Sequence, residues 1–145
     1  YGLAGGRVGY GVASKQLMEV LYKVKPPYNV TCLSQLAAKI CLENNEMMEQ
    51  SVKEIIKERE VMVAQLQKLP NIKVFKSHGN FILCEFEKAK EVYEYLLGNK
   101  VLVRYFGEEG ALAGCIRISI GTREENQLVT KLLMKVLGGA AELAV

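Results

Sequence analysis

Two short segments near the C-terminal end, 101–106 and 115–120, constrain the fold of this chain more than any other feature. β-branched and aromatic residues dominate both segments, and a glycine-marked loop (Gly107 to Gly114) separates them. That pattern predicts two strands joined by a loop. Thr122 and Glu125 then follow with the spacing of a capping box, which predicts that a helix begins directly after the second strand.

Each predicted strand carries one arginine in an otherwise apolar setting. Because side chains alternate along a strand, a simple hairpin would place Arg104 and Arg117 nearly opposite each other on one face. On the second strand that face also carries Cys115 and Ser119. The residues between them are expected to point into a core: Ile116, Ile118 and Ile120.

Two like charges that face each other across a hairpin repel and destabilise it. We therefore expect an anion between the two arginines, because guanidinium groups fork onto carboxylate or phosphate. The alternative is that each arginine pairs with a surface carboxylate such as Glu108 or Glu109. The two strands alone do not decide between these interpretations.

Composition limits the class of protein. The chain has 145 residues, half of them apolar, which is enough for a sizeable core. A net charge of +3, spread along the chain, gives no argument for nucleic acid or a membrane surface. No apolar run is long enough to span a bilayer. The four cysteines show neither CxxC nor metal-ligand spacing, so a reduced, cytoplasmic setting is expected: Cys32, Cys41, Cys84 and Cys115.

The first part of the chain is predicted to be mainly helical. A short strand is expected at Val8–Ala13, a helix capped by Ser14 at 15–24, and a second helix at 32–43. Both helices have an apolar stripe that is expected to be buried: Leu17, Val20, Leu21 and Val24 in the first, and Leu33, Leu36, Ala37, Ile40 and Cys41 in the second. A long third helix, 46–69, follows. Its apolar pattern allows a coiled coil but favours a bent helix bridging two domains.

The second part of the chain mixes strands and helices. Strands are predicted at 72–76 and 80–86, a helix at 89–97, then the arginine hairpin and a final helix to about Leu137. This order favours a small α+β layer with helices on one face of a mainly antiparallel sheet.

Other polar residues are weaker candidates for a site. Arg7 lies in a glycine-rich stretch, where a backbone can approach a phosphate closely, although a flexible turn explains the composition equally well. Tyr28 and Asn29 follow a rigid Pro-Pro pair, and Asn80 opens a strand. Loop packing or turn capping would also explain these three residues. His78 has no partners suited to a catalytic triad and is expected at the surface.

Several of these motifs occur together in one order. They are the glycine–arginine stretch, Pro26-Pro27-Tyr28-Asn29-Val30, Ser77-His78-Gly79-Asn80-Phe81-Ile82-Leu83, Val101-Leu102-Val103-Arg104 and Gly114-Cys115-Ile116-Arg117-Ile118-Ser119-Ile120-Gly121-Thr122. The set resembles the histidinol-phosphate aminotransferase family. Its members are fold-type-I enzymes that use pyridoxal 5'-phosphate (PLP). The resemblance covers nearly the whole chain and stops near Gly138.

The resemblance implies the C-terminal part of a fold-type-I PLP transferase, of class α/β and α+β, that ends in a small α+β domain with a mainly antiparallel sheet. Residues 1–45 would end the large PLP-binding domain, and residues 46–69 would form the bridging helix. Residues 70–138 would form the small domain and 139–145 a tail.

The resemblance also implies roles for single residues. Arg7 matches the arginine that binds the cofactor phosphate. Arg117 matches the arginine that grips the acidic group of the substrate, here a phosphate, and Arg104 resembles its second clamp. Tyr28 and Asn29 match a loop near the interface of a homodimer, and Asn80 matches a motif position without a definite role.

The implied activity is transamination between histidinol phosphate and glutamate/2-oxoglutarate in histidine biosynthesis. The family's Schiff-base lysine would fall two residues before Tyr1, and Gly6 stands where the family usually has leucine. The chain also starts without Met, so we expect a piece of a longer enzyme that is inactive alone. The alternatives are threonine-phosphate decarboxylase or an aromatic aminotransferase of the same fold, and a non-catalytic anion-binding α+β module.

Overall fold

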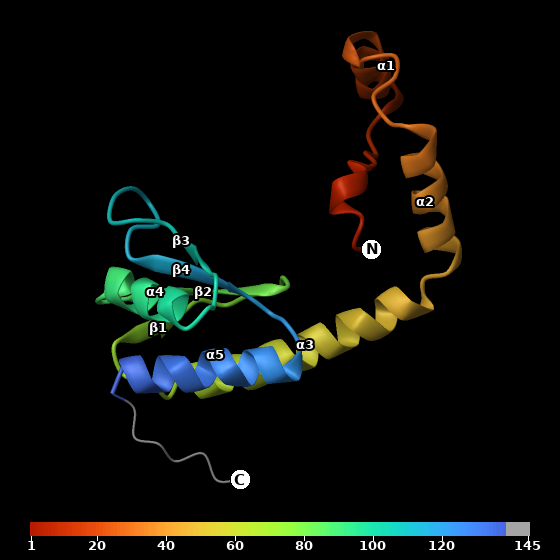
Figure 1. The fold of residues 1–145 in the computed structure, drawn as a ribbon. Coiled ribbons are helices and arrows are strands. Elements are labelled where there is room, and N and C mark those ends of the chain that lie inside the picture. The colour runs from red at the N-terminus through yellow and green to blue at the C-terminus, as the bar shows by residue number, and fades with distance from the viewer. Residues whose placement is uncertain (139–145) are drawn as a thin grey trace. The chain divides into compact units, whose positions relative to one another are not determined.

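The chain forms two compact units, Tyr1–Gln50 and Ser51 to the C-terminus (Figure 1). The computed structural model describes residues 1–138, so the predicted tail at 139–145 lies outside the described residues. The boundary between the units falls inside the long helix α3 (Glu46–Leu66). No helix within residues 1–138 combines the length and apolarity needed to cross a membrane.

The first unit contains a short 3-10 turn (Ala4–Gly6) and the two predicted helices, α1 (Lys15–Val24) and α2 (Cys32–Glu43). Ser14 begins α1 as predicted, because its Oγ accepts a hydrogen bond from the Leu17 amide at 3.4 Å. Thr31 begins α2 in the same way. Each hydroxyl satisfies one of the amides that a helix start leaves without a partner.

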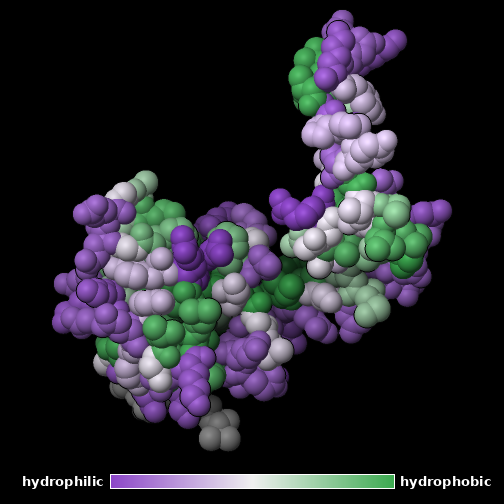
Figure 2. Space-filling view, turned by 45° about the horizontal axis from the view of Figure 1, so that its top comes forward, coloured by the Kyte–Doolittle hydropathy of each residue, from purple (hydrophilic) through white to green (hydrophobic). Residues whose placement is uncertain are grey.

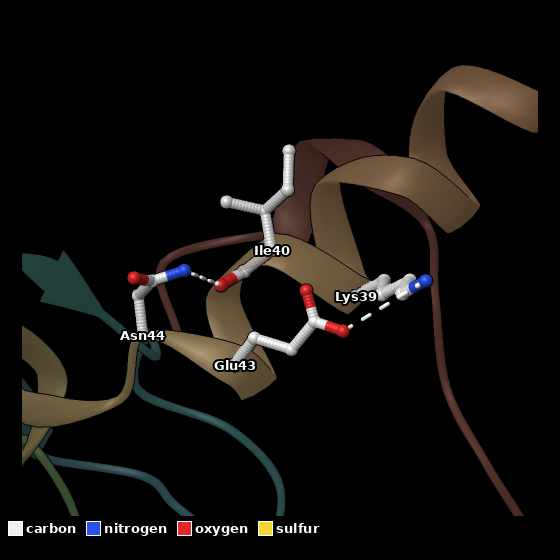
Figure 3. Close-up of polar contacts among 4 residues, drawn as sticks. All are labelled: Lys39, Ile40, Glu43 and Asn44. Carbon is white, nitrogen blue, oxygen red and sulfur yellow. Dashed lines mark hydrogen bonds and ion pairs between the residues drawn. The ribbon is translucent and has the colours of Figure 1, made fainter.

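Helix α2 ends at a polar cap (Figure 3). The side-chain amide of Asn44 donates to the Ile40 carbonyl at 2.9 Å, and the Asn44 backbone amide donates to the same oxygen at 3.0 Å. Lys39 and Glu43 form an exposed ion pair at 3.8 Å beside it. An exposed pair of this kind contributes little, so the Asn44 bonds do most to close the helix.

The strand predicted at Val8–Ala13 does not form. These residues are irregular, and residues 1–50 contain no strand. An extended segment becomes a strand only when a neighbour pairs with its backbone amides and carbonyls, and no such neighbour is present in this unit. The predicted strand at Val8–Ala13 was therefore wrong.

The apolar stripes predicted to be buried in α1 and α2 are largely exposed. Val24 keeps 73% and Leu33 75% of its surface accessible, and neither helix has a buried residue. Figure 2 shows hydrophobic surface on this part of the chain. An amphipathic pattern identifies which face can be buried, but burial also requires an opposing apolar surface. Residues 1–50 do not supply that surface.

The second unit has the predicted α+β architecture. Its strands are β1 (Ile72–Val74), β2 (Phe81–Phe86), β3 (Arg104–Tyr105) and β4 (Cys115–Ser119), and its later helices are α4 (Ala89–Gly98) and α5 (Arg123–Val136). The strands form one sheet in the order β1-β2-β4-β3, and every neighbouring pair is antiparallel.

Two elements are shorter than predicted. Helix α3 ends at Leu66 rather than Leu69, because residues 67–69 form a turn before Pro70. Strand β3 covers only Arg104–Tyr105, and residues 101–103 are not paired. Because β3 lies at the edge of the sheet, only residues that lie opposite β4 have a ladder partner.

The core lies between one face of the sheet and helices α3, α4 and α5 (Figure 1). Ile116, Ile118 and Ile120 point into it as predicted, with 0%, 2% and 8% of their surfaces exposed. Helix α5 starts at the predicted capping box, in which Glu125 Oε2 accepts from the Thr122 amide at 2.8 Å and Thr122 Oγ1 accepts from the Glu125 amide at 3.3 Å. Arg104 and Arg117 lie on the opposite face of the sheet.

We predict that Leu133→Ala lowers the free energy of unfolding by about 2–5 kcal/mol, because it removes a fully buried side chain and leaves a cavity. Leu128→Ala on the same helix is the matched control, since Leu128 is 48% exposed, and it should change stability by less than about 1 kcal/mol. Urea denaturation measures both values. Equal effects of the two substitutions would contradict this description of the core.

Candidate functional site

The β3–β4 pairing brings the two hairpin arginines together. Arg104 and Arg117 are direct cross-strand partners, and Tyr105 pairs with Ile116 beside them. Both arginines are exposed on the face of the sheet opposite the core. The expectation that they lie opposite each other on one face is confirmed.

The two arginines line one shared concavity of about 500 Å³. Ser119, which the alternation had placed on the same face, also lines it. Cys115 does not, and it is 4% exposed. The full lining is Tyr93, Leu102, Val103, Arg104, Tyr105, Arg117 and Ser119.

Aromatic rings support both guanidinium groups. The Arg117 Cζ lies 5.3 Å from the centre of the Phe81 ring, and the Arg104 Cζ lies 5.6 Å from that of Phe106. Such cation–π contacts contribute about 0.5–1 kcal/mol each at exposed sites. The sequence analysis missed both rings, although Phe106 lies two residues after Arg104 and so shares its face.

Neither arginine is neutralised by a carboxylate within residues 1–138. The ion pairs found there join Lys39–Glu43, Lys73–Glu85 and Lys88–Glu91. The alternative in which Glu108 or Glu109 pairs with the hairpin arginines is therefore not what this structure contains. Two guanidinium groups with unused donors face a common space, which is an arrangement suited to binding an anion with several oxygens.

Tyr105 lies on the other face of β3 from Arg104, because its cross-strand partner Ile116 faces the core. Its ring stacks on Tyr93 with the ring centres 5.4 Å apart. Its hydroxyl is buried and has no hydrogen-bond partner among residues 1–138. Burial raises the pKa of Tyr105, and the charge of Glu108 adds to the increase, so the hydroxyl remains a neutral donor at physiological pH. Tyr105 and Tyr93 pack against the core, so the Tyr105 hydroxyl lies on the core side of the sheet.

Three other candidate residues belong to the first unit. Arg7 ends the 3-10 turn with a left-handed backbone (φ 51°), and its side chain is exposed and makes no ion pair within residues 1–138. An unpaired guanidinium beside glycines fits the chemistry of phosphate binding. Tyr28 is 96% exposed, and the Asn29 Oδ1 accepts from the Lys25 ammonium at 3.0 Å.

The turn that contains Asn80 borders the sheet. The Asn80 side chain is exposed, and its backbone carbonyl accepts from the Ile120 amide at 2.9 Å. This bond extends the β2–β4 ladder by one step. His78 is exposed in the same turn. The structure therefore gives Asn80 a backbone role and leaves its side chain unassigned.

The buried cysteines are chemically inert. Burial raises the pKa of the Cys84 thiol to about 12, and the nearby Cys115 thiol adds to the increase. At pH 8 the Cys84 thiol is therefore fully protonated, and the thiol is a far weaker nucleophile than the thiolate. All four cysteines are free.

We predict that iodoacetamide at pH 8 labels the exposed Cys32 and leaves Cys84 unmodified in the folded chain. Mass spectrometry of tryptic peptides measures the two extents. Urea should make Cys84 as reactive as Cys32, which serves as the control. Equal labelling of both residues without urea would contradict the burial described above.

Comparison with known proteins places the whole arrangement in a family. A family model for aminotransferase class I and II matches residues 1–133. Histidinol-phosphate aminotransferase 1 of Carboxydothermus hydrogenoformans is 48% identical over 136 residues, which is 93% of this chain and 38% of the relative. The chain thus spans well under half the length of this curated relative.

Solved structures show the same likeness. The histidinol-phosphate aminotransferase from Clostridium acetobutylicum superimposes with a TM-score of 0.84 at 28% identity, covering 94% of this chain and 42% of that one. The L-threonine-O-3-phosphate decarboxylase from Porphyromonas gingivalis gives 0.82 at 27% identity, covering 95% and 44%. The fold class expected from the sequence is confirmed, and so is the resemblance to histidinol-phosphate aminotransferases.

Proposed function

The chain belongs to the aminotransferase class I and II family, and on that premise we propose that the complete protein is a PLP-dependent histidinol-phosphate aminotransferase. It would transfer an amino group between histidinol phosphate and glutamate/2-oxoglutarate, in histidine biosynthesis, as a cytoplasmic homodimer. The relatives named above support the substrate. The observation that carries the proposal is the pair of guanidinium groups, Arg104 and Arg117, that share one concavity without a carboxylate partner among residues 1–138.

In this proposal Arg104 and Arg117 bind the phosphate of the substrate. Two forked donors on a rigid sheet hold that phosphate in one orientation, and so they also fix where the amino-bearing carbon lies. The stacks on Phe81 and Phe106 keep each guanidinium plane in place before the substrate arrives. The orientation of the substrate is thus determined by residues far from the bond that breaks.

Arg7 would bind the phosphate of the cofactor. When bound, PLP supplies an electron sink for the electrons that remain after the substrate Cα–H bond is broken. The left-handed turn at Arg7 and the open space around Gly5 and Gly9 leave its guanidinium accessible to an anion. Tyr28 and Asn29 are proposed to lie near the partner subunit, and Asn80 is retained as a candidate without a role.

We predict that Arg117→Ala in the complete enzyme lowers kcat/KM for histidinol phosphate by roughly 10- to 150-fold, the value expected when one charged hydrogen-bonding partner is lost. Activity toward histidinol, which lacks the phosphate, should change much less. Steady-state kinetics with both substrates measures the difference. Arg123→Ala is the matched control, because Arg123 is exposed and lies outside the concavity. Unchanged kinetics for Arg117→Ala would remove the assignment.

By the resemblance described above, the Schiff-base lysine of the family would fall outside these 145 residues. We therefore predict that the 145-residue chain, supplied with PLP, histidinol phosphate and 2-oxoglutarate, forms no glutamate above the rate of a heat-denatured control. A coupled glutamate assay measures this. Turnover by the chain alone would show that one of its own lysines can perform the proton transfer, contrary to the proposal.

The likeness to a threonine-phosphate decarboxylase favours a second candidate function. Both activities need a phosphate clamp, so the arginine pair does not distinguish them. The complete enzyme should release no CO2 from threonine phosphate while it transaminates histidinol phosphate. Release of CO2 at a comparable rate would favour the decarboxylase, and preference for aromatic amino acids would favour an aromatic aminotransferase.

A further inference from the structure

Helix α3 contains a buried arginine that the proposed function does not use. Arg59 is only 9% exposed and interrupts an apolar row of the helix. No ion pair neutralises it within residues 1–138. Burying a guanidinium group is costly, and a Met or Leu would fill the same space without that cost. The hydrogen bond that Arg59 donates to Gly79 indicates what it does.

The Arg59 Nη1 donates to the backbone carbonyl of Gly79 at 2.8 Å. Gly79 lies in the turn that leads into β2. Ser77 closes this turn, because its Oγ accepts from the Gly79 amide at 3.2 Å and donates to the Phe81 carbonyl at 2.6 Å. Arg59 therefore fixes the turn to helix α3, twenty residues earlier in the chain.

This turn also contacts the aromatic ring of Phe81, which lies next to the Arg117 guanidinium. A Cβ added at Gly79 would lie 3.2 Å from Phe81 Cε1, so the Gly79 backbone packs directly against the Phe81 ring. The same ring also contacts the Arg117 guanidinium, whose Cζ lies 5.3 Å from the ring centre. Arg59, Gly79, Phe81 and Arg117 thus form a continuous series of contacts from the helix to the site.

Glu58, which precedes Arg59 in α3, helps to hold the end of β4. Glu58 Oε2 accepts from the Asn126 side-chain amide at 3.2 Å. Asn126 in turn bonds both the amide of Gly121, at 2.9 Å, and its carbonyl, at 3.1 Å. Gly121 follows β4, the strand of Arg117. Two successive residues of α3 therefore fix the start of β2 and the end of β4.

We propose that Arg59 is a positioning residue for the anion site, which acts by holding the Gly79 turn and the Phe81 ring against the Arg117 guanidinium. The inference rests on the proposed function of Arg117 as an anion clamp. Arg59 itself does not contact the anion.

The test is a titration of inorganic phosphate into the 145-residue chain labelled with ¹⁵N-arginine, followed by NMR at the Arg117 Nε–Hε signal. Arg59→Met should shift that signal before phosphate is added, because the ring current it experiences depends on the Phe81 ring. It should also weaken phosphate binding about 5- to 10-fold, since one oriented contact is lost. Arg59→Lys, which can still donate one bond to Gly79, should give an intermediate affinity.

Two further variants separate positioning from charge and from misfolding. Lys53→Met removes one exposed positive charge from the same helix, and it should leave both the signal and the affinity as in the parent chain. Gly79→Ala keeps Arg59 but displaces the Phe81 ring by a few tenths of an ångström, so it should also shift the Arg117 signal. This variant decides the matter if Arg59→Met does not fold.

The outcomes are distinct. A parent-like signal and affinity in Arg59→Met, or in Gly79→Ala where that variant decides, would overturn the inference. An equal loss in Lys53→Met would also overturn it, because charge alone would then be responsible. If the parent chain shows no response to phosphate, the proposed function fails. The Arg117 signal of the phosphate-free variants then still decides whether Arg59 positions that side chain.

Discussion

The structure of the candidate site depends on the register of one strand pair. Because Arg104 lies directly opposite Arg117, two positive side chains share one face of the sheet within reach of the same ligand. The two positive charges repel each other, and the repulsion is larger the less water screens it. The two ring stacks offset only about 1–2 kcal/mol of this. An anion that accepts hydrogen bonds from both groups would remove the remaining imbalance.

The core determines this register. Pairing with β2 and the burial of Ile116 and Ile118 hold β4 in place. A slip of one residue by the edge strand β3 would therefore turn Arg104 toward the core and Tyr105 away from it. Packing of the sheet against α4 and α5 therefore holds both arginines in place, because moving either one would require separating the sheet from these helices. Arg59 adds a bond from a third helix to the same region. The burial of apolar side chains on one face of the sheet thus determines where the arginine side chains lie on the other face.

Local chemistry was readable from the sequence. The capping box at Thr122 and the helix start at Ser14 depend on residues three positions apart, and both are present as predicted. The facing arginines followed from strand alternation. What failed or was missed depends on distant residues: the strand at 8–13 lacks a partner, and the Phe81 ring reaches Arg117 only through the fold. The Arg59 bond to Gly79 spans twenty residues and has no local pattern.

A double-mutant cycle on phosphate binding tests the central claim most directly. If Arg104 and Arg117 bind one anion together, Arg104→Ala, Arg117→Ala and the double variant should give clearly non-additive losses, with a coupling energy on the order of 1 kcal/mol or more. After either arginine is removed, removing the second should then cost much less than it does in the parent chain. Strictly additive losses, or no loss in either single variant, would mean that the two guanidinium groups do not form one site.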